Sequence, residues 1–381
     1  MMPQCRALLG EYPEEFFFKV EMNRPRAWAV RTMMASDLDN LTDSVKVPWV
    51  DGNRFLESYF KRVHPFHPFL DRDEVRELYE DTMHKGIGID NSSALVLAIL
   101  ALGATVSDAA DLKPELRTGE AFIQQALKIL FASWTFTFSG DVIISQALTL
   151  CSLYFTYAVE PLMAWRLIHM ASTSIQQLFS RCKNLLSSEP EVQTLTRLSW
   201  VCFIIESDIL AKFHQPRSGI ELLVDRLPFP NYGEIPSPEN LYALADISAR
   251  ALLNRIHHAL FFTDSLTIYS GQSLDNVSSS RIPILNPDAS HLRVCEELSR
   301  QLEAWYDSIP DVIKPDLNGN PVGSRQTCLL RLRYWSAKRN IFRAFVIYVT
   351  SRKWEGEEVP QAVLEMCEIC LHASRMFIVM A

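Results

Sequence analysis

The stretch from Thr194 to Pro230, TLTRLSWVCFIIESDILAKFHQPRSGIELLVDRLPFP, predicts a long buried helix that ends before a proline. Apolar side chains recur along it at intervals of three and four residues, which is the spacing of one helix face. Other large apolar residues fall between them, so little of the helix surface is polar. We therefore expect this helix inside a larger bundle. The regular face consists of Leu195, Leu198, Cys202, Ile205 and Ile209.

Two carboxylates, Glu206 and Asp208, lie within this apolar helix. A charge that is buried without a partner costs more free energy than its apolar neighbours supply, so each carboxylate needs a partner. Arg217 follows the proline stop at Pro216, and Lys212 lies four residues after Asp208. We interpret Glu206, Asp208 and Arg217 as structural pairing groups at the helix end and as candidates for the lining of an effector pocket.

The composition is that of a globular chain long enough to bury a sizeable core. Of its 381 residues, 48% are hydrophobic and 22% are charged. The formal net charge is -8, and the isoelectric point is near 5.7. Binding of nucleic acid over the whole surface would need an excess of Lys and Arg, so any DNA contact has to be local.

Targeting and membrane signals are weak. The N-terminal MMPQCRALLGEYPEEFFFKV lacks the basic and apolar regions of a signal peptide. The uncharged run from Val142 to Val159 contains several Ser, Thr and Gln residues and is closed by Glu160-Pro161, which favours a buried core helix over a membrane span. We expect neither export nor membrane insertion.

The eight cysteines do not form a disulfide framework, since six of them are scattered singly along the chain. Their distribution fits a reducing compartment. Cys367 and Cys370 form a Cys-x-x-Cys pair in a helical stretch, which is half of a zinc-site spacing without a second half. A structural role is the simpler interpretation, and metal or redox chemistry is the alternative.

The rest of the chain predicts an all-α protein, because no stretch combines β-branched alternation with turn residues. Residues 1–50 are mixed and are interpreted as an N-terminal extension or linker, and 51–381 as a single large multi-helix domain with proline-rich loops. Helices are expected near 55–63, 72–84, 93–106, 120–133, 142–159, 162–180, 240–266, 294–308, 329–351 and 360–381. The last of these has no cap or polar tail, which suggests a fold truncated at its C-terminal end.

The segment HPFHPFLDRDEV, which begins at His64, is held extended by its prolines. These prolines prevent His64 and His67 from sharing one helical turn, so we expect aromatic and proline packing there and not a metal-ligand pair. Asp71 and Glu74 have the spacing of a capping box that opens the helix from 72 to 84. Ser92 or Ser93 can cap the following apolar helix.

Arginine, lysine and aromatic residues alternate in the stretch from Leu329 to Ser351, a mixture found on nucleic-acid-binding surfaces. Its apolar residues keep helical spacing, however. We therefore predict an amphipathic core helix with a basic outer face.

Motifs of catalysis are missing from the sequence. It has no phosphate-binding glycine loop, dinucleotide fingerprint, nucleophile elbow or His-Glu-x-x-His. The adjacent pair His257-His258 points in different directions on a helix and cannot converge on one ligand. We expect no enzyme activity and no cofactor bound by this chain.

Five blocks, taken in order, resemble the fungal-specific transcription factor domain, the regulatory middle homology region of binuclear zinc cluster regulators. They are FLESYFKRVHPFHPFLDRDEV at 55–75, ALVLAILALGA at 94–104, SQALTLCSLYFTYAVEPLMAWRLIHMAS at 145–172, RLSWVCFIIESDILAKFHQPRSGI at 197–220 and LRYWSAKRNIFRAF at 332–345. The likeness covers about 50–381. It departs where the family has Gly-Arg-Pro and this chain has Gln215-Pro216-Arg217, so the turn has to be made by other means.

The resemblance implies a regulator of transcription by RNA polymerase II that is nuclear or shuttles between nucleus and cytoplasm. Control of a metabolic gene cluster would be one such role. The partners that it implies are other regulators, a second copy of the chain or a small-molecule effector. The family's DNA-binding module needs six cysteines around two zinc ions, and residues 1–50 contain only Cys5. Zinc is therefore expected only in a module upstream of this chain, and DNA contact through that module or indirectly. The alternative is an all-helical small-molecule-binding protein or enzyme with a central pocket.

Overall fold

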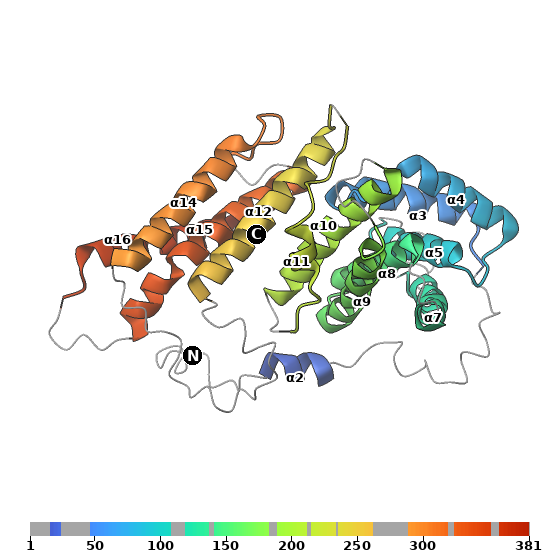
Figure 1. Cartoon of the computed structure of the whole chain (residues 1–381), viewed down its shortest axis with the longest axis horizontal. Helices are drawn as coiled ribbons and strands as arrows, with labels where there is room; N and C mark the ends of the chain where they lie inside the picture. The colour runs from blue at the N-terminus through green and yellow to red at the C-terminus, as the bar shows by residue number, and fades with distance from the viewer. Residues whose placement is uncertain are drawn as a thin grey trace. The chain divides into compact units, whose positions relative to one another are not determined.

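The structure, a computed structural model, describes residues 16–23, 46–107, 119–136, 141–182, 189–211, 215–233, 235–261, 289–318, 324–351 and 358–380. Within these ranges the chain forms helices and loops and no β-strand (Figure 1). The all-α prediction is confirmed. The predicted extension over 1–50 falls mostly outside the described residues, apart from α2 (Phe16–Asn23) and the residues from 46 onward.

The described residues divide into two compact units, one up to Ala243 and the other from Leu244 onward. The division falls inside α12 (Pro238–Phe261). The single domain predicted over 51–381 stays a prediction. None of the described helices combines the length and hydropathy of a membrane span.

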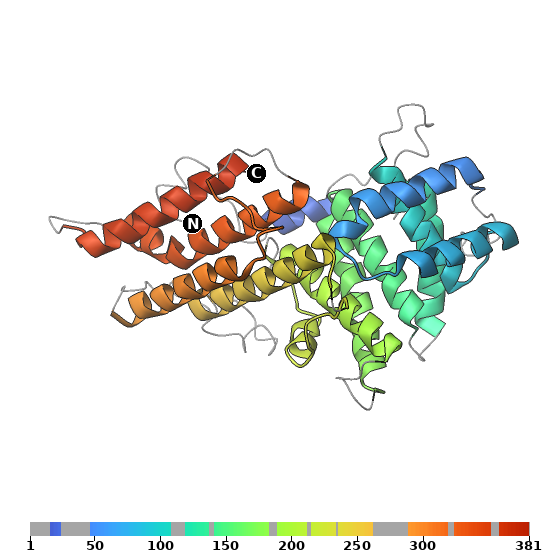
Figure 2. The same ribbon diagram turned by 90° about the horizontal axis from the view of Figure 1, so that it is seen from above.

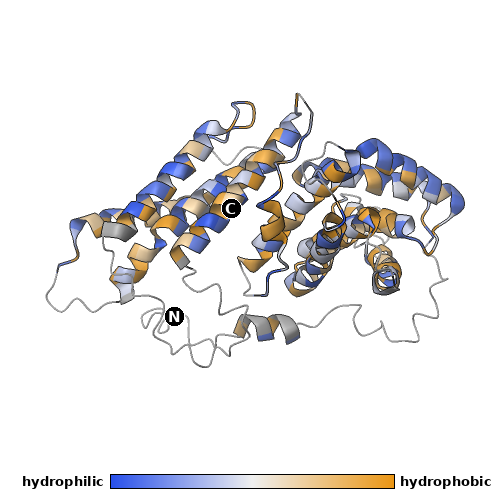
Figure 3. Ribbon diagram, in the orientation of Figure 1, coloured by the Kyte–Doolittle hydropathy of each residue, from blue (hydrophilic) through white to orange (hydrophobic). Residues whose placement is uncertain are grey.

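The core of the first unit is α5 (Asn91–Thr105), a helix without a polar face. Every residue from Ser93 to Ala104 is buried, because the run ALVLAILALGA is apolar around the whole helix. Four helices cover it: α3 (Trp49–Arg62), α4 (Arg72–Lys85), α7 (Glu120–Phe136) and α8 (Val142–Tyr157). Figure 3 shows the apolar residues of α5 and α8 gathered inside and the polar face of α4 outside. α5 is therefore the apolar centre of this unit.

Gly103 allows α3 to approach α5 closely. A Cβ atom at this position would lie 2.0 Å from the carbonyl oxygen of Phe55, which is backbone of α3 and cannot rotate away. Gly119 acts in the same way on the other side, since its Cβ would lie 2.3 Å from the carbonyl oxygen of Ala101. Its φ of 65° also lies in the left-handed region that favours glycine.

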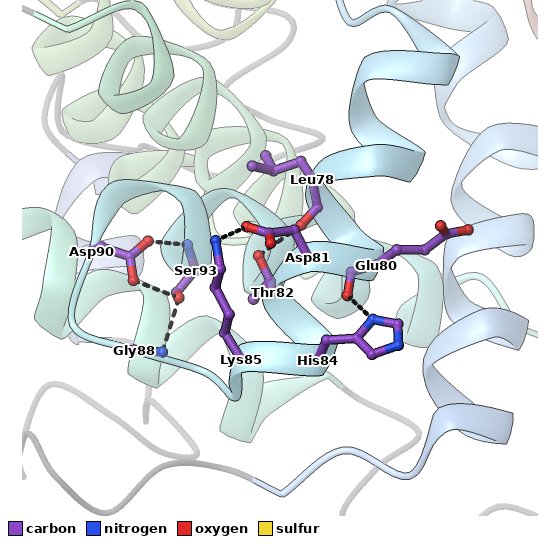
Figure 4. Close-up of polar contacts among 9 residues, drawn as sticks. All are labelled: Leu78, Glu80, Asp81, Thr82, His84, Lys85, Gly88, Asp90 and Ser93. Atoms are coloured by element: carbon purple, nitrogen blue, oxygen red, sulfur yellow. Dashed lines mark hydrogen bonds and ion pairs between the residues drawn. The ribbon is translucent and has the colours of Figure 1, made fainter.

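Side-chain caps fix the start of α4 and of α5. Asp71 accepts hydrogen bonds from the backbone N–H groups of Asp73 (2.9 Å) and Glu74 (3.1 Å), so the predicted start of α4 is confirmed. The predicted serine cap of α5 is wrong, because Asp90 is the cap and accepts from the N–H of Ser93 at 2.9 Å. The Ser93 hydroxyl instead donates to Asp90 and accepts from Gly88 N–H, which closes the α4–α5 turn (Figure 4).

The turn between α8 and α9 (Pro161–Phe179) contains a strained residue. The N–H of Val159 donates to the carbonyl of Thr156, and the N–H of Glu160 donates to that of Phe155, which is the Schellman pattern of a helix end. This pattern places the residue after the cap in the left-handed region, and Val159 has a φ of 59°. Glycine is preferred there, because a β-branched side chain crowds the backbone.

The second unit contains α12 from residue 244 onward, α14 (Ala289–Ser308), α15 (Arg325–Ser351) and α16 (Gln361–Met380). The basic outer face predicted for the helix over 329–351 is wrong in part. Arg331 and Arg333 are buried, and Arg333 Nε donates to Asp246 of α12 at 2.8 Å. The two arginines thus point inward because a buried carboxylate, distant in sequence, receives one of them.

We predict that Gly103→Ala lowers the free energy of unfolding by about 2 kcal/mol, because the new methyl group forces α3 and α5 apart. Urea denaturation followed by circular dichroism measures the change. An unchanged midpoint would contradict the close approach of the two helices.

We predict that Val159→Gly raises the free energy of unfolding by about 0.5–1 kcal/mol, since relief of the left-handed strain exceeds the added freedom of the unfolded chain. Val159 is 63% exposed, so little packing is lost. Thermal unfolding measures the change. Val159→Ala is the matched control: it keeps a Cβ atom and should gain less than the glycine variant. Equal gains in both would argue against strain at this position.

Candidate functional site

The candidate site is the segment Gln215–Pro230, which includes α11 (Ile220–Val224) and is called the α11 segment below. It leaves the end of α10 (Pro190–Leu210) and lies against α10 and α9. Six of its first eleven residues are Pro, Arg, Ser, Gly, Glu or Gln, so few of its own side chains can bury it. Ile220, Val224 and Leu227 are nevertheless buried, and polar side chains of α9 and α10 reach the backbone of the segment.

Glu206 of α10 makes the most buried of these contacts. Its side chain is 3% exposed, and its Oε1 accepts a hydrogen bond from the backbone N–H of Ser218 at 2.8 Å. Burial raises the pKa of this carboxyl above its ordinary value of 4.5, while the hydrogen bonds from Ser218 and the charge of Arg217 act in the opposite direction. Glu206 therefore joins the end of α10 to the start of the α11 segment.

Arg217 points to a different acid. Its guanidinium forms an ion pair with the carboxylate of Glu221, one helical turn further along, and both side chains are half-buried. Its positive charge also favours the ionised form of Glu206. Glu206 and Arg217 lie in one neighbourhood, where Glu206 accepts a hydrogen bond from Ser218 and Arg217 forms its ion pair with Glu221.

Asp208 is not on the same face of α10 as Glu206. The two residues are two positions apart, so their side chains leave the helix about 200° apart around its axis. Asp208 is half-buried and has interactions of its own. Lys212, its predicted partner, lies outside the described residues. The role of Glu206, Asp208 and Arg217 as an effector-pocket lining stays a prediction.

Two tryptophans bind the two ends of the α11 segment through proline carbonyl groups. Trp165 of α9 donates its indole N–H to the carbonyl of Pro216 at 3.1 Å, and Trp200 of α10 donates to that of Pro228 at 2.8 Å. The ring of Trp200 also stacks on Phe229, with 5.2 Å between the ring centroids. Each end of the segment is therefore fixed to a different helix.

The middle of the segment is bound by Gln176 of α9 and turned by Gly219. Gln176 Nε2 donates to the carbonyl oxygen of Ser218 at 3.0 Å. Gly219 has a φ of 90°, and a Cβ atom there would lie 3.2 Å from Gln176 Oε1. Gly219 therefore makes the turn in this stretch, which has Gln215-Pro216-Arg217 in place of Gly-Arg-Pro.

Sequence reasoning missed Trp165, Gln176, Trp200, Ser218 and Glu221 as members of this site. Their partners are backbone atoms or a residue of the same short segment, and side-chain patterns do not report backbone donors and acceptors. The one available signal was Gly219, which stands directly before a short helix and after a serine.

The Cys-x-x-Cys pair is built into helix packing. Cys370 is buried and its thiol donates to the carbonyl of Arg339 at 3.5 Å, while Cys367 is half-buried. Burial raises the pKa of both thiols, which disfavours the thiolate that metal binding or redox exchange requires. In the part of the chain that the structure describes, no three His, Cys, Asp or Glu side chains are grouped to hold a metal ion.

Two of the histidines singled out in the sequence, His64 beside α3 and His257 of α12, make local contacts. The Nε2 of His64 donates to the carbonyl of Leu70 at 2.9 Å, and its ring lies 5.1 Å from that of Phe60. Burial lowers the pKa of His64. His257 lies near Asn340 of α15, with 3.3 Å between Nε2 and the amide nitrogen. These contacts support the interpretation of His64 as a packing residue. The extended conformation predicted for this segment is wrong at its start, because His64–Phe66 is a short 3-10 helix whose turn is closed by a hydrogen bond from the His67 N–H to the His64 carbonyl at 2.9 Å.

This arrangement is better suited to a change in the position of the α11 segment than to catalysis of a covalent reaction. The α11 segment is connected to two helices by hydrogen bonds worth about 0.5–1.5 kcal/mol each. A binding event that competes for a few of these bonds could therefore shift the segment.

Comparison with known proteins gives one family. The family model described as the fungal specific transcription factor domain matches residues 56–307, from α3 to the end of α14. No curated protein and no solved structure matches the chain.

We predict that Glu206→Ala lowers the free energy of unfolding by about 1–3 kcal/mol, because the Ser218 N–H loses its buried acceptor. Glu206→Gln keeps an acceptor oxygen and should cost less. Because the folded-state pKa of Glu206 is raised, the wild type is favoured most below the unfolded pKa and loses stability as pH rises through the folded pKa.

The stability difference between wild type and Glu206→Gln should therefore move in favour of the glutamine variant as pH rises from 4.5 towards 8. Urea denaturation of both proteins across this range measures it. A difference that moves towards the wild type would mean that the hydrogen bonds from Ser218 and the charge of Arg217 outweigh burial.

Proposed function

The chain belongs to the family of the fungal specific transcription factor domain, and from this membership we propose that it regulates transcription by RNA polymerase II in the nucleus. The match over residues 56–307 carries the proposal. It covers the buried core around α5, all of the α11 segment and most of α14, so it does not rest on one short motif.

The family consists of transcription regulators and is not an enzyme family. In our proposal the chain works by binding and not by catalysis. The chemistry of its buried thiols supports this: Cys202 of α10 lies 3.3 Å from the hydroxyl of Thr149, and burial raises the pKa of that thiol to about 12. A thiol with such a pKa is a poor nucleophile at neutral pH.

We propose that contact with DNA is indirect or is made by another module. The net charge of -8 opposes broad binding to phosphates. The one basic stretch suggested by the sequence is partly turned inward, since Arg331 and Arg333 are buried and Lys338 contacts Glu303 at 2.9 Å. A binuclear zinc cluster would belong to that other module.

Within this proposal the α11 segment is the element on which a small-molecule effector or a partner regulator acts. In this proposal its hydrogen bonds to Glu206, Gln176, Trp165 and Trp200 are exchanged without unfolding of α9 or α10. Control of a metabolic gene cluster and shuttling between nucleus and cytoplasm are the finer parts of the proposal.

A tethering experiment tests the proposed function. The chain fused to a foreign DNA-binding domain should raise or lower transcription from a reporter that carries the matching sites. The DNA-binding domain alone sets the baseline. The fused Leu100→Asp variant, which places a charge at a fully buried position of α5, is the matched control, because loss of the folded core should remove the effect while immunoblotting confirms its level. No change in transcription under any growth condition would contradict the proposal.

A further inference from the structure

Among the 20 prolines of the chain, Pro238 alone follows a serine or a threonine. Ser237 stands directly before α12, and Ser237, Pro238 and Glu239 are all exposed. Ile235, two residues before Ser237, is 93% exposed. Figure 2 shows α12, in yellow, as one continuous helix. The Ser237-Pro238 dipeptide at its start is therefore open to solvent.

The hydroxyl group of Ser237 is weakly held. Its Oγ accepts a hydrogen bond from the backbone N–H of Asn240 at 3.2 Å, which is long for such a bond. The Ser237 carbonyl accepts from the N–H of Leu241 at 2.9 Å and so closes the first turn of α12. The next residue, Tyr242, is buried, and its ring lies edge-on to that of Phe66 at 5.9 Å. An enzyme can therefore bind Ser237 in an extended conformation if only this first turn unwinds.

The proline after the serine selects one class of enzyme. Proline has no backbone N–H, so it can enter an apolar subsite without leaving a donor unsatisfied. Any other residue at this position would bury an unpaired N–H there, which costs free energy. Protein kinases with such a subsite, called proline-directed, therefore accept a serine followed by proline and discriminate against a serine followed by another residue.

We propose that Ser237 is a phosphorylation site for a proline-directed protein kinase. The Ser237 Oγ attacks the γ-phosphorus of ATP and gives its proton to the carboxylate base of the kinase. The bond from the γ-phosphorus to the bridging oxygen breaks, and ADP leaves. The phosphoserine carries a charge of about -1.5 to -2 at pH 7. This inference is independent of the proposed role in transcription.

The phosphate would stand at the first turn of α12. The positive end of the helix dipole favours its charge, and the neighbouring carboxylate of Glu239 opposes it. Because these two effects have opposite signs, we expect α12 to stay folded after modification. The phosphorylated chain then presents a new anionic group at the surface.

Ser324 is a matched control within the chain, because it has the same position at the start of another helix. It is exposed and stands directly before α15. Its Oγ accepts from the N–H of Thr327 at 3.1 Å, and its carbonyl accepts from the N–H of Cys328 at 3.0 Å. The residue that follows is Arg325. A kinase that required only an exposed serine at a helix start would modify both serines, whereas a proline-directed kinase modifies Ser237 alone.

Incubation of the full chain with ATP and a purified proline-directed kinase tests the site. Peptide mapping by mass spectrometry should find phosphate on Ser237 and not on Ser324. Pro238→Ala should slow the modification about tenfold or more, because alanine brings an N–H into the apolar subsite. Arg325→Pro should make Ser324 a second site, since proline is well suited to the first position of a helix. Circular dichroism confirms that both variants fold.

The same mapping on the tagged chain, isolated from growing fungal cells with phosphatases inhibited, tests whether the site is used. We expect to recover the peptide that contains phosphorylated Ser237. An unmodified Ser237 in the wild type after incubation with the kinase, undiminished modification of Pro238→Ala, or recovery of the cellular peptide only without phosphate would overturn the proposal.

Discussion

The structure depends on the burial of α5, a helix that has no face suited to water. Because every residue from Ser93 to Ala104 is buried, other helices have to surround it. Gly103 and Gly119 allow two neighbouring backbone segments to approach it. This requirement brings together α3, α4, α7 and α8, and α8 in turn positions α9 and α10. The α11 segment is therefore presented on helices whose own arrangement is determined by the core.

The attachment of the α11 segment is of another kind. Its contacts with α9 and α10 run mainly from side chains to backbone: Glu206 to Ser218 N–H, Gln176 to Ser218 carbonyl, and two indole groups to proline carbonyls. Each such hydrogen bond contributes modestly to the free energy of unfolding. Burial of the Glu206 carboxyl costs desolvation free energy, which opposes the gain from its hydrogen bond. In our proposal the segment held by these polar bonds is the part that responds to a ligand or partner.

Much of the fold was predictable, and the reason is periodicity. The apolar spacing of α10 and the continuous apolar run of α5 predicted two buried helices, and Asp71 predicted the start of α4. What escaped prediction depends on partners that are distant or have no side-chain signal. Arg333 is buried because Asp246 lies 87 residues earlier in the chain, and Val159 adopts a conformation that valine rarely takes. The sequence predicted an ion pair for Glu206. Its partner in the structure is instead the backbone N–H of Ser218, which side-chain patterns do not reveal.

The family assignment and the fold lead to one central claim, which is that this chain acts on transcription in the nucleus through protein contacts. Chromatin immunoprecipitation of the tagged chain, expressed at its natural level, tests it most directly. We expect enrichment at a defined set of promoters and altered synthesis of their transcripts when the chain is deleted. Absence of the chain from chromatin, with transcript synthesis unchanged by its deletion, would contradict it.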